Sequence, residues 1–140
     1  MKTLLLDTNV LLRFITGEPA DQAKAVADLV LAAEAGKVRL AVLPMVLAEA
    51  VFVLTGFYEH PRSKVVSVLS HLISCPGFHS DEQDRMVHAL KLFGSSTLDF
   101  VDCYLAAASI REGRFLVSFD RDLAKLHGIT LKKPGDCLTL

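Results

Sequence analysis

The stretch Leu4-Leu-Leu-Asp-Thr-Asn-Val-Leu-Leu12 joins a short apolar run to an acidic residue and then to a second apolar run. Residues 3–6 have the length and composition of a buried strand, and residues 9–15 have those of an apolar helix. Asp7 is therefore expected between a strand and a helix. Because sites in parallel α/β folds form beyond the carboxyl ends of strands, Asp7 is a candidate functional carboxylate.

The rest of the chain continues this alternation of short strands with longer helices. Strands are predicted over residues 38–42, 115–119 and 129–131, and helices over 20–35, 45–54, 61–74, 81–93, 99–112 and 121–126. Gly36 and Gly113 are placed as helix stops, and Ser80-Asp-Glu-Gln83 matches a capping box. The pattern predicts a single α/β domain over residues 1–140, with helices flanking a central, mainly parallel sheet.

Composition limits the classes of protein to consider. The chain has 140 residues, 51% of them apolar, and a mean hydropathy of +0.40. That apolar content indicates either a dense core or an apolar surface used by a second copy or another partner. Three cysteines without a CxxC pair favour a reducing compartment over a disulfide framework.

Neither a leader nor a membrane span is predicted. The apolar run before Asp7 is too short for a signal peptide. The longest apolar stretch, residues 41–54, contains Pro44 and Glu49 and is shorter than the roughly 20 residues that a spanning helix needs. We therefore expect a soluble, cytoplasmic protein.

The charges are balanced overall but uneven along the chain. The net charge of −1 excludes a polybasic nucleic-acid binder. Residues 111–133 nevertheless hold six basic and three acidic side chains. This basic segment either attracts phosphate groups to a nearby site or consists of solvated helix faces.

Several acidic residues lie outside the polar helix faces on which most acids of the chain fall. Glu49 is the only ionisable residue between Ala41 and Leu54, and Asp102 has apolar neighbours on both sides. Asp120 follows the apolar run 115–119, and Asp99 precedes Asp102 by one helical turn. Carboxylates in apolar surroundings need compensation, and several meeting at one sheet edge repel each other. A divalent cation resolves both problems, and Mg²⁺ or Mn²⁺ prefers oxygen ligands.

This arrangement of acids predicts phosphodiester hydrolysis by a metal-activated water. Structural alternatives exist for most of them. Asp7, Asp99 and Asp120 can each cap the helix that follows, and Asp102 can assist the cap before it. Asp122 can be a first-turn helix acid, whereas a mid-helix Glu49 has no capping role.

Four segments in order resemble the motifs of PIN-domain ribonucleases, and most of all the VapC-type toxins of bacterial toxin–antitoxin pairs. The segments are Leu4-Leu-Leu-Asp-Thr-Asn-Val-Leu-Leu12, Leu47-Ala-Glu49, Leu98-Asp-Phe-Val-Asp-Cys-Tyr-Leu-Ala-Ala107 and Phe115-Leu-Val-Ser-Phe-Asp-Arg-Asp-Leu123. The resemblance implies that four acids are catalytic and bind the metal: Asp7, Glu49, Asp102 and Asp120. It implies supporting roles for Asn9, Asp99, Ser118 and Asp122, and it leaves open whether Asp120 or Asp122 is the fourth acid.

The resemblance also implies a three-layer sandwich and an activity. The family's toxins are Mg²⁺- or Mn²⁺-dependent endoribonucleases that cleave RNA. A homodimer and inhibition by a small VapB-like antitoxin protein are implied as well.

Two rival functions remain as hypotheses. A haloacid-dehalogenase-like phosphatase also places an aspartate after its first strand, but it needs a second aspartate where this chain has Asn9. The other rival is a non-catalytic PIN-like domain that binds RNA or a protein partner. Nucleotide-binding loops, paired zinc spacing among the histidines and a glycine-flanked nucleophile elbow at Ser118 are absent from the sequence.

Overall fold

A computed structural model describes residues 2–139 of the chain as a mixture of helices and parallel strands. The elements in chain order are β1 (Thr3–Leu5), α1 (Thr8–Thr16), α2 (Ala20–Glu34), β2 (Arg39–Ala41), α3 (Pro44–Gly56), α4 (Arg62–Ile73), α5 (Gln83–Gly94), α6 (Phe100–Glu112), β3 (Leu116–Val117), η1 (Arg121–Lys125), β4 (Leu131–Lys132) and η2 (Pro134–Thr139). The predicted α/β class is confirmed. The short 3₁₀ helix η2 was not expected.

The strands form two small parallel sheets. Leu4 of β1 lies opposite Leu40 of β2, and Leu116 of β3 lies opposite Leu131 of β4. Within residues 2–139 these pairs are not joined, so the expected single central sheet is not what the structure shows. Sequence patterns locate strands, whereas the choice of partner strand depends on tertiary packing.

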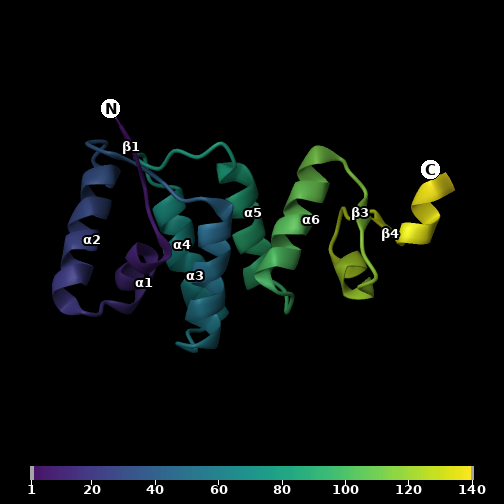
Figure 1. The fold of residues 1–140 in the computed structure, drawn as a ribbon, viewed down its shortest axis with the longest axis horizontal. Helices are drawn as coiled ribbons and strands as arrows, with labels where there is room; N and C mark the ends of the chain where they lie inside the picture. Colours follow the sequence, from purple (N-terminus) through teal and green to yellow (C-terminus); the bar gives the residue numbers. More distant parts are fainter. Residues whose placement is uncertain (1, 140) are drawn as a thin grey trace.

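Figure 1 shows the consequence for the overall shape. The β1–β2 pair lies toward one end of an elongated molecule and the β3–β4 pair toward the other, with α3 to α6 between them. The C-terminal unit, which we define as residues 114–139, follows α6 and lies beyond it.

The core is built mainly from the six helices α1 to α6, together with β2. Leu11, Leu12 and Ile15 are buried in α1, and they pack with the buried apolar residues of α2 to α6. Burial of such a side chain contributes about 1.5–3 kcal/mol. The apolar helix predicted after Asp7 therefore contributes mostly to the core.

Helix ends were predicted with mixed success. Gly36 and Gly113 end their helices in the left-handed region, with φ of 74° and 64°. The capping box at Ser80 is wrong, because α5 begins at Gln83. Ser80 Oγ accepts a hydrogen bond from Glu82 N–H at 3.3 Å, and the Gln83 amide donates to Ile73 O at 2.6 Å. The Gln83 side chain thus binds the end of α4 and not the backbone of Ser80, as a capping box would require.

Part of the apolar content reaches the surface. Leu5 of β1, Phe52 of α3 and Phe119 after β3 are 66%, 77% and 82% exposed. Among the helices of residues 2–139, each is too short or too polar to span a membrane.

Candidate active site

Asp7 lies where the sequence predicts, between β1 and α1. Its Oδ1 accepts a hydrogen bond from Val10 N–H at 3.1 Å and caps the helix. The carboxylate is exposed, as is Asn9 in the first turn of α1. Capping therefore explains the local geometry, while exposure leaves the carboxylate accessible to a ligand.

Glu49 lies in the middle of α3, on the outer face of that helix. Leu47, Ala50 and Val51 are buried, whereas Glu49 itself is exposed. The expectation of an apolar environment for this carboxylate is wrong, because the helix turns its apolar residues inward and Glu49 outward. Its charge thus needs no buried partner.

Asp99, Asp102 and Asp120 are brought together by α6 and the chain after β3. Asp99 is the N-cap residue of α6 without a side-chain capping bond, and Asp102 lies in the first turn. Partial burial raises the pKa of the Asp102 carboxyl, and the negative charges of Asp99 and Asp120 raise this pKa further. The spacing of Asp99 and Asp102 predicted this pair, and Asp120 joins it from a distant segment.

Asp120 and its neighbours form a tight turn. Asp120 Oδ1 accepts a hydrogen bond from Asp122 N–H at 2.9 Å, and Ser118 Oγ accepts one from Asp120 N–H at 3.0 Å. Asp122 forms an ion pair with Lys125 at 3.0 Å. Asp120 thus begins η1 as a cap, in agreement with the structural alternative from the sequence, and Ser118 positions it.

A cavity of about 260 Å³ lies between α3 and α6, beside two of these acids. Asp99 and Asp102 line it together with Phe52, Thr55 and Phe100. The sequence did not single out Phe52, because an aromatic residue in an apolar helix is expected in the core. Its 77% exposure at this cavity identifies Phe52 as a candidate ligand-binding residue.

Arg62 forms part of the cavity wall and is held by other groups. Its guanidinium lies 3.5 Å from the centre of the Phe93 ring. It donates one hydrogen bond to Phe93 O at 3.0 Å and another to Leu98 O. With these contacts made, Arg62 acts as a structural wall of the cavity.

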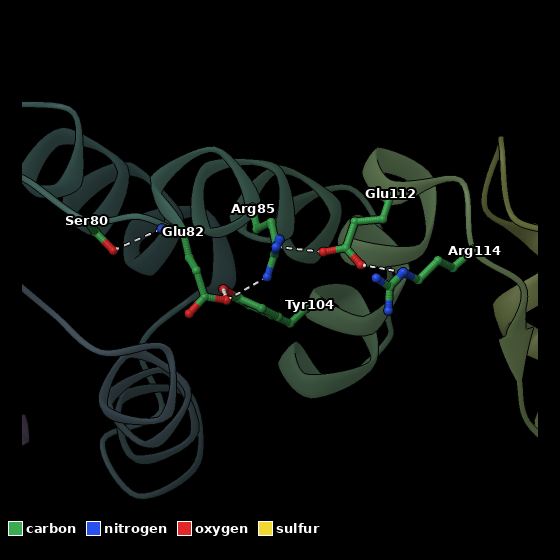
Figure 2. A network of polar contacts seen from close by, with 6 residues as sticks. All are labelled: Ser80, Glu82, Arg85, Tyr104, Glu112 and Arg114. Carbon is green, nitrogen blue, oxygen red and sulfur yellow. Dashed lines mark hydrogen bonds and ion pairs between the residues drawn. The ribbon is translucent and has the colours of Figure 1, made fainter.

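A network of polar contacts holds α5 and α6 together (Figure 2). The Arg85 guanidinium pairs with Glu82 at 2.8 Å and with Glu112 at 2.6 Å, and Glu112 also pairs with Arg114 at 3.3 Å. The Tyr104 hydroxyl donates to Glu82 at 3.1 Å. Burial and this bond raise the pKa of Tyr104 to about 12. The network fixes the end of α6, from which the C-terminal unit continues.

A second cavity, of about 480 Å³, lies between β2 and the start of α5. His79, Asp81 and Glu82 contribute to its lining. Glu82 already binds Arg85 and Tyr104, and none of the four predicted catalytic acids reaches this cavity. It is therefore separate from the candidate site.

The predicted metal site is not assembled within one chain. Over residues 2–139, no group of three or more His, Cys, Asp or Glu side chains is arranged to hold a metal ion. Asp102 and Asp120 influence each other, whereas neither Asp7 nor Glu49 is among the charges that raise the pKa of Asp102. The four acids come from four separate segments and are not gathered into one such group within the described residues, so a shared metal site remains a prediction.

In a comparison with known families, the chain matches the model of the PIN domain over residues 4–129. This range contains Asp7, Glu49, Asp102 and Asp120. No curated protein matches the chain.

Proposed function

The chain belongs to the PIN-domain family, and from that membership we propose that it is a divalent-metal-dependent endoribonuclease. PIN domains are generally metal-dependent nucleases, so a hydrolase acting on nucleic acid is the family's activity. The match over residues 4–129, with all four acids inside it, carries the proposal. Membership favours neither a haloacid-dehalogenase-like phosphatase nor a non-catalytic binding domain.

The finer part of the proposal is a VapC-type toxin of a type II toxin–antitoxin system. The four motif segments support it, together with a surface that exposes large apolar side chains suited to a protein partner. Such a toxin would use Mg²⁺ or Mn²⁺, act on RNA in the cytoplasm, form a homodimer and bind a small antitoxin protein.

Asp7, Glu49, Asp102 and Asp120 are the proposed metal-binding and catalytic acids. A bound divalent ion would supply charge neutralisation at phosphate and an activated water. Asp120 is preferred to Asp122 as the fourth acid, because its charge reaches Asp102 whereas Asp122 is paired with Lys125. Asn9, Ser118 and Asp99 are proposed to support these acids.

The cavity beside Asp102 suits an unpaired base of an RNA substrate. RNA-binding proteins commonly stack unpaired bases on aromatic rings and bind their edges through polar groups. Phe52 offers an exposed ring, and the Asp99 carboxylate can accept a hydrogen bond from a base amino group. We assign this cavity to a base next to the scissile phosphate.

The test is cleavage of end-labelled total RNA with analysis of the product ends. We expect cutting in Mn²⁺ or Mg²⁺, none in EDTA, and products with 5′-phosphate and 3′-hydroxyl ends. Products ending mainly in 2′,3′-cyclic phosphate contradict hydrolysis by a metal-activated water. RNA binding without cleavage in Mn²⁺ supports the non-catalytic alternative, and a phosphorylated Asp7 supports the phosphatase.

A further inference from the structure

The two sheets leave complementary strand edges without partners. Within residues 2–139, β1 pairs only with β2, and β3 pairs only with β4. Isolated two-stranded sheets have marginal stability, and parallel sheets are normally covered on both faces. Each pair is therefore an incomplete sheet.

Backbone hydrogen bonds identify the open edges. Leu6 N–H donates to Ala41 O of β2, so the neighbouring peptide group of Leu5 faces the other edge of β1. Leu116 N–H and Ser118 N–H donate to Thr130 O and Lys132 O. The peptide group of Val117, between them, consequently faces the open edge of β3.

Apolar side chains lie along both open edges. Leu5 is 66% exposed and Val117 is 50% exposed, and Phe115 and Phe119 flank the latter on the same segment. Exposed apolar side chains beside unpaired strand edges are typical of surfaces that add another strand.

The C-terminal unit is held away from the β1 edge of its own chain. Gly113 N–H and Arg114 N–H both donate to Ser109 O, and the buried Ser109 hydroxyl donates to Arg114 O at 2.5 Å. Glu112 is bound by Arg85 and Arg114, and Gly128 packs on Ile110. In Figure 1, β1 and β3 lie on opposite sides of the α3–α6 helices. Pairing within one chain would require these contacts to break.

Charge favours a second copy as the occupant of the β1 edge. Over residues 114–139 the C-terminal unit has five basic and three acidic side chains, a net charge of +2. Because the whole chain has a net charge of −1, the remaining residues are net negative. The positively charged C-terminal unit of one copy thus complements the negatively charged residues 1–113 of another copy. Contact between residues 1–113 of two copies would instead bring like charges together.

We propose that two copies of the chain pair reciprocally, with β3 of each adding in parallel to the β1 edge of the other. The product is a closed dimer with two four-stranded sheets in the order β2–β1–β3–β4. Each sheet takes β1 and β2 from one copy and β3 and β4 from its partner.

The dimer has a consequence for the divided acidic site. In a parallel sheet the ends of neighbouring strands meet at one edge, so Asp7 after β1 comes beside the Asp120 that follows β3 of the other copy. Asp102 of that other copy lies near its Asp120, so it is placed at the same site. The catalytic meaning of this arrangement rests on the proposed function, but the strand pairing does not.

Cross-linking through engineered cysteines tests the pairing without RNA or metal. Leu5→Cys and Val117→Cys are combined in a full-length chain that also carries Cys137→Ser, since the remaining Cys75 and Cys103 are buried. A short bismaleimide is expected to give a covalent dimer of twice 15.3 kDa. Light scattering on the unmodified protein is expected to give the same dimer mass.

In the matched control, Leu31→Cys takes the place of Leu5→Cys, because Leu31 is similarly exposed, at 60%, and belongs to the helix α2 and not to a strand. A cross-linked product of monomer mass shows that β3 closes onto its own chain and overturns the proposal. A monomer in light scattering, or dimer yield no higher than in the Leu31→Cys control, also overturns it. None of these outcomes depends on nuclease activity, so the two proposals fail separately.

Discussion

Asp120, after β3, lies close enough to Asp102, in the first turn of α6, for its charge to raise the pKa of the Asp102 carboxyl. The two residues are far apart in sequence and come from different elements. Electrostatic coupling of this kind is common where carboxylates serve a functional site. It places two of the four proposed catalytic acids in one cluster.

Removal of one neighbouring charge tests this coupling. Asp120→Asn should lower the pKa of Asp102 toward its ordinary value, because an adjacent negative charge disfavours ionisation. Carboxyl carbon shifts in an NMR pH titration measure the change. Asp28→Asn, at an exposed ion pair with Lys24, is the control, and an unchanged Asp102 pKa in Asp120→Asn contradicts the coupling.

Two substitutions at Asp7 separate its capping role from its proposed catalytic role. Asp7→Asn keeps an oxygen that can accept from Val10 N–H, so the free energy of unfolding should be nearly unchanged, whereas Asp7→Ala should lose about 1 kcal/mol. Both variants should lose RNA cleavage. Chemical denaturation and the cleavage assay measure the two effects, and wild-type cleavage by Asp7→Asn would remove Asp7 from the site.

Phe52→Ala tests whether the cavity beside Asp102 binds a base. Loss of base stacking costs about 1–3 kcal/mol, which corresponds to roughly 5- to 150-fold weaker RNA binding. Fluorescence anisotropy with single-stranded RNA measures the affinity. Phe57→Ala is matched in exposure, at 81%, but lies outside the cavity. Equal affinities for the two variants would exclude a base at this position.

Gly77→Ala tests the packing of the chain before α5 against α2 and β2. A Cβ at Gly77 would overlap with Ala33 O and would lie 2.6 Å from Val38 O. Both are backbone atoms, so the cost should reach or exceed about 1–3 kcal/mol. Thermal unfolding measures the loss. Gly56→Ala meets open space at the end of α3 and should be neutral or slightly stabilising, and an equal effect at both sites would contradict this packing.

Local chemistry explains what the sequence predicted well. An apolar run followed by Asp7 fixes a strand, a cap and a helix within a few residues, and Gly113 ends α6 because it adopts a φ of 64°. The same local logic predicted Asp99 and Asp102 on one face of α6. These features depend on neighbours in the chain.

Features that depend on distant partners were not predictable in this way. Whether β1 pairs with β2 alone or also with β3 is decided by how α6 directs the C-terminal unit. The outward position of Glu49 follows from which face of an almost uniformly apolar helix packs on the core. The capping box at Ser80 failed because Gln83 bonds to the end of α4.

RNA cleavage by Asp102→Asn is the most direct test of the proposed nuclease. The substitution keeps the shape of the side chain and removes the charge that the proposed metal site requires. In Mn²⁺, the variant should cleave labelled RNA at least about 100-fold more slowly than the wild type. Substitution of residues that only support a metal ligand typically slows a reaction by about 10- to 100-fold, so the loss of a ligand should be at least as large. Asp28→Asn should cleave at the wild-type rate. Wild-type cleavage by Asp102→Asn would contradict the assignment of this acidic cluster as the active site.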